Sequence, residues 1–335
     1  MRCGLALAWC ALQVATGGCL AFQQQRVEHL AGEPGIYQFV DVDGVRLHIR
    51  DSGGDRREAV LLIHGYASSL TTWNANFAAW SVGQRVIGVD LKGFGESDKP
   101  AGDYSPDAHA ALLFKLLDQL GVERVHVVGH SWGCSIALAM ALEQPARVGR
   151  VVLMSAWVYE DQLPLFMRLS RVPGVGEALY ALYYREQTEV RLEGAFYDDR
   201  YISEGLIDAV KAAYDRPGAV AAAHATARDQ IFSSVEAHYP ELANETLLIW
   251  GREDRTSGVE VGERLDGELR HARLVVLPRV GHFPMIECAT KVNRLVADFL
   301  DERPAVEASP APAIVTPTAQ PTEQPASSRS AEGQP

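Results

Sequence analysis

Short apolar runs rich in valine, isoleucine and leucine recur along the chain, and longer stretches with helical spacing separate them. A run of four to eight such residues between turn-forming residues is typical of a buried β-strand. Eight runs predict strands: Tyr37–Val42, Val45–Asp51, Val60–His64, Arg85–Leu91, Arg124–Gly129, Arg150–Ser155, Leu247–Trp250 and Arg273–Leu277. The first two flank Asp43-Gly44, a turn signal that predicts a hairpin. The later runs are almost wholly apolar, as expected for parallel strands covered on both faces.

Helical patterns lie between these strands. Residues 106–120 place one apolar stripe on a predicted helix, formed by Ala108, Leu112, Leu116 and Leu120. Residues 132–144 are small and apolar, and Pro145 ends that helix. Alternating strands and helices predict an α/β fold with a doubly wound, mostly parallel eight-stranded sheet.

One long stretch interrupts the alternation. From residue 158 to residue 240 the pattern is helical and rich in aromatic side chains. It falls between two predicted core strands, so we expect a helical lid inserted into a core made of residues 36–157 and 241–301. Ligands of open α/β sheets bind at the carboxyl ends of the strands, which such a lid would cover. The alternative is that the aromatic side chains only hold the lid helices together.

The N-terminal residues 1–21 have the order of an export signal. Arg2 precedes an apolar run, Leu5–Val14, and small residues follow. Cys19 comes directly after Gly17-Gly18, as at a bacterial lipoprotein cleavage site, where it would carry lipid and anchor the chain to a membrane. An ordinary cleaved signal is the alternative. We expect an exported bacterial protein, periplasmic or membrane-anchored, and a cytoplasmic one if no signal is present.

The C-terminal residues 303–335 hold seven of the 17 prolines, among alanine, threonine, serine and glutamine. Such a segment cannot bury enough apolar surface to offset its ordering entropy, so it is predicted to be disordered.

Ser131 lies in Gly129-His130-Ser131-Trp132-Gly133, directly after a predicted strand and before a predicted helix. A sharp turn between strand and helix has no room for side chains beside the serine, which explains the two glycines. The turn raises the hydroxyl above the sheet, at a helix N-terminus that favours negative charge. Ser131 is therefore the candidate nucleophile.

A nucleophilic serine needs a base, and the base needs an orienting acid. His282 follows the last predicted strand, and Asp254 follows the strand Leu247–Trp250, so both emerge at the sheet edge where Ser131 emerges. The chain order serine, aspartate, histidine is the one found with this type of elbow. His64 and His130 are weaker alternatives for the base, because their loops restrict them. Glu253 is the competitor of Asp254 for the acid.

The loop His64-Gly65-Tyr66 follows the strand that begins at Val60. In this architecture such a loop supplies one backbone N–H of an oxyanion hole, and the residue after the nucleophile supplies the other. These donors are predicted to be Tyr66 and Trp132. The alternative for His64-Gly65 is a plain turn.

Several segments together resemble the α/β-hydrolase fold superfamily. They are Leu61–Gly65, the stretch from Val89 to Asp98, the Gly129–Gly133 elbow, Ile249–Asp254 and Gly281–Pro284. The resemblance spans residues 36 to 301 and is closest to the lidded branch of carboxylesterases, C–C bond hydrolases, haloalkane dehalogenases and epoxide hydrolases. In that branch dehalogenases and epoxide hydrolases carry Asp where this chain has Ser131, which disfavours both activities. Cys134 departs from the second glycine common in the family, and Asp90 and Asp98 are expected to hold a loop.

These features predict a serine hydrolase that cleaves a small or medium apolar carboxylic ester through an acyl-enzyme. Trp157 and Phe166 are possible pocket residues. The alternatives are a C–C bond hydrolase acting on a dione, and a non-catalytic binding or sensor protein with the same fold.

The charge and the spacing of possible ligands limit the partners. The net charge is −12, which gives the chain no electrostatic reason to bind nucleic acid. No cysteine or histidine spacing indicates a metal site, and no organic cofactor is implied. The expected partner is a small-molecule substrate, with possible membrane anchoring through Cys19.

Overall fold

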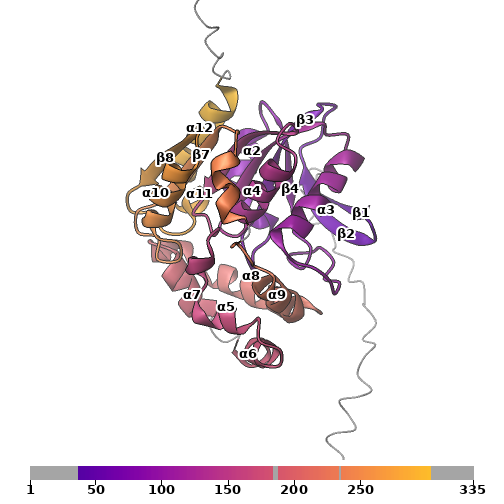
Figure 1. Ribbon diagram of the computed structural model, residues 1–335, viewed down its shortest axis with the longest axis vertical. Helices are drawn as coiled ribbons and strands as arrows, with labels where there is room; N and C mark the ends of the chain where they lie inside the picture. Colours follow the sequence, from indigo (N-terminus) through magenta and orange to yellow (C-terminus); the bar gives the residue numbers. More distant parts are fainter. Residues whose placement is uncertain (1–36, 184–187, 234, 303–335) are drawn as a thin grey trace, which may run out of the picture. The chain divides into compact units, whose positions relative to one another are not determined.

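The protein is described by a computed structural model that covers residues 37–183, 188–233 and 235–302 (Figure 1). The predicted export signal with Cys19 and the predicted disordered tail lie outside these residues. In the described part of the chain, none of the helices combines the length and the hydropathy needed to cross a membrane.

Eight strands form one sheet in the order β1-β2-β4-β3-β5-β6-β7-β8. Their bounds are β1 Tyr37–Val42, β2 Val45–Asp51, β3 Glu58–Ile63, β4 Arg85–Val89, β5 Arg124–His130, β6 Val148–Met154, β7 Thr246–Gly251 and β8 Ala272–Leu277. The β1/β2 and β2/β4 pairs are antiparallel and all other pairs are parallel. The predicted doubly wound, mostly parallel sheet is confirmed. The hairpin has the predicted bounds, and the other strand ends lie within two residues of the prediction.

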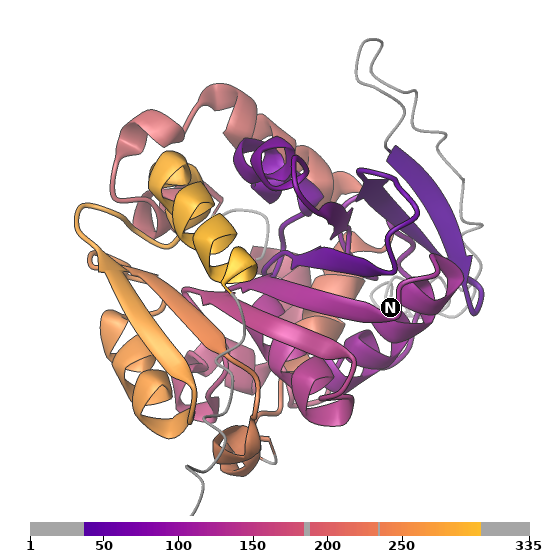
Figure 2. The same cartoon turned by 90° about the horizontal axis from the view of Figure 1, so that it is seen from above.

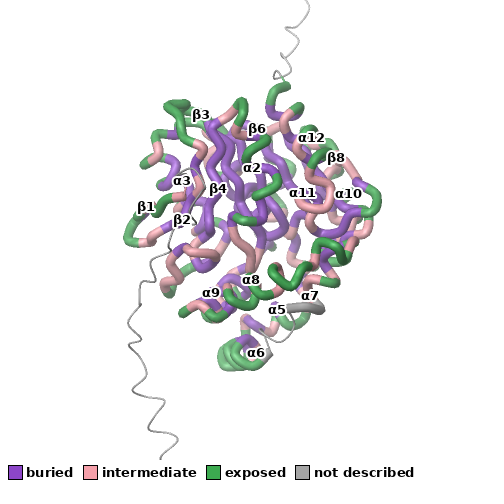
Figure 3. The backbone as a smooth tube through the Cα atoms, turned by 180° about the vertical axis from the view of Figure 1, so that it is seen from behind, coloured by how far each residue is buried: buried purple, intermediate pink, exposed green. Residues whose placement is uncertain are grey.

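Helices cover both faces of the sheet (Figure 2). One face packs against α2 (Asn74–Trp80) and α12 (Ala289–Asp301), whose apolar residues form a cluster with alternate residues of the strands. The other face packs against α3 (Pro106–Gln119), α4 (Gly133–Glu143) and α10 (Val259–Glu268). Two buried faces explain why the parallel strands are apolar without alternation. The central strands are buried along most of their length (Figure 3).

The predicted apolar stripe of α3 is displaced in the structure. Of the four predicted residues only Leu116 is buried, whereas Ala108, Leu112 and Leu120 are half-buried. The buried residues of the helix are Pro106, His109, Ala110, Leu113, Phe114, Leu116 and Leu117. The helix therefore turns a broader face to its neighbours than a single stripe, because α4 and the sheet both pack against it.

The chain between β6 and β7 forms the helical insertion. Its elements are η2 (Glu160–Gln162), α5 (Leu165–Leu169), α6 (Val175–Tyr183), α7 (Thr188–Ala195), η3 (Asp199–Tyr201), α8 (Glu204–Asp215), α9 (Ala219–Arg228) and η4 (Glu236–Glu241). Figure 1 shows α5 to α9 gathered at one end of the sheet. Hydrogen bonds connect them to the loops after β3 and β8, so the insertion lies at the carboxyl ends of the strands.

Candidate active site

Ser131 occupies the tight turn between β5 and α4. Its φ of 51° lies in the left-handed region, which a non-glycine residue adopts only under constraint. The turn is held because the Ser131 N–H donates to the Met154 carbonyl at 2.9 Å and the Ser131 carbonyl accepts from Trp157 N–H at 3.0 Å. A Cβ on Gly133 would lie 2.4 Å from the Ile63 carbonyl oxygen, so only glycine fits there. The predicted elbow is present.

The ring of His282 pairs with Asp254. Nδ1 of His282 lies 2.9 Å from one Asp254 carboxylate oxygen and 3.1 Å from the other, and both side chains are buried. Asp254 also accepts backbone N–H groups of Thr256 and Ser257, both at 2.9 Å. These bonds fix the carboxylate, which in turn holds the imidazole with its Nδ1 protonated. The structure thus gives His282 and Asp254 the relation expected of a base and its orienting acid.

Glu253 does not compete for the imidazole. Its carboxylate accepts the Val280 N–H at 3.1 Å, and its own N–H donates to the Val280 carbonyl at 3.1 Å. Adjacent residues point in different directions from a loop, and here only Asp254 points toward His282. Glu253 therefore shapes the loop that carries the histidine.

The loop that carries His282 adjoins the elbow. His130, which directly precedes Ser131, donates its Nε2–H to the His282 carbonyl at 2.8 Å, and the two rings lie 4.9 Å apart. Among the described residues the Ser131 hydroxyl has no hydrogen-bond partner, so the expected bond between Ser131 and His282 is not formed. Such bonds are often long in free hydrolases and shorten when substrate binds.

The two weaker histidine candidates have structural contacts instead. His64 accepts the Leu91 N–H on Nε2 at 3.0 Å, and its Nδ1 lies 2.7 Å from the Gly65 carbonyl oxygen. Burial lowers the pKa of His64 and of His130, which keeps both rings neutral. Both residues fix loops around the elbow.

The predicted oxyanion donors occupy the expected loops. Trp132 begins the turn into α4, and among the described residues its backbone N–H has no acceptor. Tyr66 follows β3, and its hydroxyl donates to the Ala223 carbonyl of α9 at 3.0 Å and lies 3.0 Å from the Tyr180 hydroxyl. The loop that would hold an oxyanion is therefore tied to the helical insertion.

The two possible pocket residues have different positions. Trp157 lies beside the elbow, because its N–H bonds to Ser131, and its buried indole N–H has no partner among the described residues. Phe166 lies further out on α5: it is 43% exposed, and its ring centroid is 6.4 Å from that of Tyr180.

The loop after β4 is held as expected. The buried Asp90 carboxylate lies 2.7 Å from Nδ1 of His48 and accepts the Leu70 N–H at 2.7 Å. Asp98 accepts the Arg46 N–H at 3.0 Å. Cys134 is buried in α4, where burial raises the pKa of its thiol, so it serves packing.

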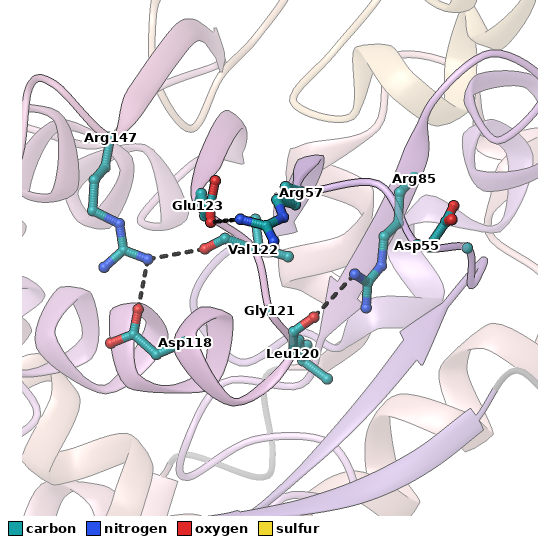
Figure 4. Close-up of a pocket in the computed structure, with 10 residues that line it drawn as sticks. Asp55, Arg57, Arg85, Asp118, Leu120, Gly121, Val122, Glu123 and Arg147 are labelled. Atoms are coloured by element: carbon teal, nitrogen blue, oxygen red, sulfur yellow. Dashed lines mark hydrogen bonds and ion pairs between the residues drawn. The ribbon is translucent and has the colours of Figure 1, made fainter.

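A hollow of about 680 Å³ lies at the end of the sheet opposite Ser131 (Figure 4). It is lined by segments that precede β3, β4, β5 and β6, so it faces the amino ends of the strands. Each of its three arginines is paired: Arg57 with Glu123, Arg147 with Asp118 at 2.7 Å, and Arg85 with Asp51 at 2.7 Å. This hollow is remote from Ser131 and offers no unpaired cation to a ligand.

Sequence reasoning missed two side chains that shape the site. Ser257 donates its hydroxyl to the Ala156 carbonyl at 2.7 Å, which ties the Asp254 loop to the end of β6. Glu287 accepts the Gly281 N–H at 2.8 Å, one residue before His282. Both contacts depend on the tertiary fold, and no local pattern signals them.

Buried neutral histidines predict that the protein loses stability in mild acid. Burial lowers the pKa of His109 to about 4, so between pH 6.5 and pH 4 the unfolded chain binds a proton there that the folded chain does not. From pH 7 to pH 5 this costs about 2 kcal/mol for His109 alone, and His64 and His130 act in the same direction. Urea unfolding at a series of pH values measures the loss.

The matched variants for this prediction are His109→Phe and His238→Gln. His109→Phe removes part of the pH dependence, and His238→Gln, which replaces an exposed histidine, is the control. Carboxylates with ordinary pKa values titrate mainly below pH 5 and do not obscure the measurement. A free energy of unfolding that stays constant from pH 7 to pH 5 would contradict the prediction.

Comparison with known proteins gives a consistent result. The sequence profile of the α/β-hydrolase fold family matches residues 58–289. A 2-hydroxy-6-oxononadienedioate/2-hydroxy-6-oxononatrienedioate hydrolase of Cupriavidus pinatubonensis is 34% identical over 287 residues, which cover 80% of this chain and 96% of that protein. The hydrolase of the same name from Paraburkholderia xenovorans is also 34% identical, over 76% of this chain and 91% of its own length.

Solved structures agree with the sequence matches. The meta-cleavage product hydrolase CumD of Pseudomonas fluorescens has a TM-score of 0.68 and 29% identity, over 79% of this chain and 97% of that one. Est816, described as an N-acyl homoserine lactone degrading enzyme, has a TM-score of 0.64 and 25% identity, over 78% of this chain and 100% of its own.

Proposed function

The chain belongs to the α/β-hydrolase fold family, and on that premise we propose that it hydrolyses a carbon–carbon bond next to a ketone, with Ser131 as nucleophile. The observation that carries the proposal is its 34% identity, over nearly their whole length, to hydrolases named for 2-hydroxy-6-oxo dienedioates. Such a compound has a ketone and two carboxylates but neither an ester nor an amide. Its hydrolysis has to break a carbon–carbon bond.

The residues of the candidate active site can perform this reaction. Ser131 adds to the ketone carbon, and its proton passes to His282, whose positive charge Asp254 stabilises. Backbone N–H groups of Tyr66 and Trp132 stabilise the oxyanion. Before cleavage the substrate shifts its 2-hydroxyl proton to carbon 5 and becomes a 2-oxo compound. When the intermediate collapses, the bond between carbons 5 and 6 breaks, its electron pair is delocalised onto the 2-oxo group as a dienolate, and the dienolate takes the proton held by His282. Water, deprotonated by His282, then releases the acyl group from Ser131 as a carboxylic acid.

Ester hydrolysis is the second candidate, because the same residues serve it and the lining of a small hollow near the site is mostly apolar. The hollow is about 20 Å³ and is lined by Ala67, Ser68, Gly93, Phe94, Gly95, Lys99, Ala213, Tyr214, Ala219 and Ala223. Most of these residues are small or apolar. The ammonium of Lys99 already donates to the Gly95 and Ser97 carbonyls, at 2.9 and 2.8 Å. Fewer of its N–H groups can therefore donate to a substrate carboxylate.

A comparison of two substrate classes tests the proposal. We expect kcat/KM for a 2-hydroxy-6-oxo dienoate, followed by the loss of its absorbance, to exceed that for the p-nitrophenyl ester of the same acyl group by about tenfold or more. The control is the analogue with an alcohol at position 6, which has no electrophilic carbonyl and stays intact. Preference for the ester would reject C–C hydrolysis in favour of the second candidate.

A further inference from the structure

The carboxylate of Glu287 lies between the loop of the predicted base and the helical insertion. Glu287 is the last residue of the short helix α11 (Pro284–Glu287). One of its oxygens accepts the Gly281 N–H at 2.8 Å. The other accepts the N–H groups of Tyr197 and Asp198, at 2.9 and 3.3 Å, in the segment that follows α7. One side chain therefore joins two segments that are far apart in the sequence.

Other contacts hold the loop of His282 directly against the end of α7. His282 donates its backbone N–H to the Ala195 carbonyl at the end of α7, at 2.7 Å. A Cβ on Gly281 would lie 2.5 Å from that carbonyl oxygen, so the two backbones leave no room for a side chain. The rings of Phe196 and Phe283 stack with centroids 4.7 Å apart. The backbone of the predicted base is thus in direct contact with the insertion.

The hydrogen bonds of Glu287 are of a strong type, which fixes the positions of the backbone segments that they join. Hydrogen bonds from N–H groups to a carboxylate are shorter and stronger than those to a neutral acceptor. Among the described residues Glu287 forms no ion pair with lysine or arginine, so backbone N–H groups are what balance its half-buried charge. Burial raises the pKa of Glu287, and the hydrogen bonds from those N–H groups oppose the rise because they favour the ionised form.

We propose that Glu287 is a positioning residue: by tying the segment after α7 to Gly281, it sets where the imidazole of His282 stands relative to Ser131. The inference rests on the proposed role of His282 as the base. Asp254 controls the orientation of the ring, whereas Glu287 controls the position of the backbone that carries it. Displacing a catalytic group by about 1 Å can cost about a hundredfold in rate, so the position of this backbone matters for the reaction.

The test is Glu287→Gln. The amide keeps one acceptor oxygen, but its NH₂ group faces N–H donors on the other side, so one of the two segments is released. We expect kcat to fall about tenfold to a hundredfold at a temperature where the variant is fully folded, with KM changed less than about threefold. We also expect the far-downfield proton resonance of the His282–Asp254 hydrogen bond to shift or broaden.

The matched control is Asp229→Asn. Asp229 also joins the insertion to the core through a carboxylate, which accepts the Tyr104 N–H at 3.0 Å, but it does not touch the loop of His282. We expect this variant to change thermal stability without altering kcat more than about twofold. If Glu287→Gln fails to fold, Glu287→Asp serves instead, because its shorter side chain keeps the charge but cannot reach both segments.

Two results would overturn the proposal. One is a Glu287→Gln protein with lower thermal stability but wild-type kcat and an unchanged histidine resonance. The other is an equal loss of kcat in the Glu287 and Asp229 variants, which would indicate docking of the insertion in general. The resonance is observed without substrate, so it still tests this joint if the wild type proves inactive and the proposed function fails.

Discussion

Replacing Ser131 with alanine is expected to lower kcat/KM by about 10⁴-fold or more. The hydroxyl is the only group of the elbow that can form the covalent intermediate, and the alanine variant retains binding and oxyanion stabilisation alone. Steady-state turnover of the preferred substrate measures the loss. Covalent labelling by a fluorophosphonate, followed by mass spectrometry, checks that the modified residue is Ser131.

Ser155→Ala is a close control for this experiment. Ser155 follows the neighbouring strand β6, has a similarly unusual φ of 49°, and is buried with a hydroxyl that has no partner among the described residues. Removing this second hydroxyl is expected to change kcat/KM by less than about threefold. Turnover by Ser131→Ala above about 1% of the wild-type rate would remove the acyl-enzyme from the mechanism.

The sheet was predictable because its signals are local. The central parallel strands are buried on both faces and therefore appear as apolar runs, and Asp43-Gly44 marks the hairpin between β1 and β2. The buried face of α3 was not predictable to the same degree. Half-buried residues such as Ala108 and Leu112 look the same in sequence as buried ones, and only the packing of neighbouring elements separates them.

The candidate active site was predictable for a similar reason. Ser131, Asp254 and His282 each follow a strand, and the carboxyl ends of parallel strands share one edge of the sheet. Glu287 had no such signal, because its function depends on the segment after α7 reaching the loop of His282. The choice between ester and ketone could not be made from these motifs either. The same three side chains serve both reactions, and the sequence favoured the ester, whereas the relatives favour the ketone.

Asp254→Asn is expected to lower kcat about 10⁴-fold while the protein keeps its fold. The asparagine can still accept the backbone N–H groups of Thr256 and Ser257 on its oxygen, and it then presents its NH₂ group to Nδ1 of His282. An N–H donor at that position favours the imidazole tautomer whose proton is on Nε2, which cannot accept the proton of Ser131. The variant also lacks the negative charge that stabilises the imidazolium. Circular dichroism and urea unfolding check the fold, and single-turnover acylation measures the rate.

Glu253→Gln is the matched control, since it neutralises the neighbouring carboxylate on the same loop. Its oxygen can still accept the Val280 N–H, so the loop keeps its shape, and kcat is expected to fall less than about tenfold. The contrast between the two variants separates a charge that acts on the imidazole from one that only shapes the loop. If Asp254→Asn kept kcat within tenfold of wild type and Glu253→Gln lost most of it, the acid would be Glu253. The 2.9 Å contact between Asp254 and His282 would then be structural, because it would have no effect on proton transfer.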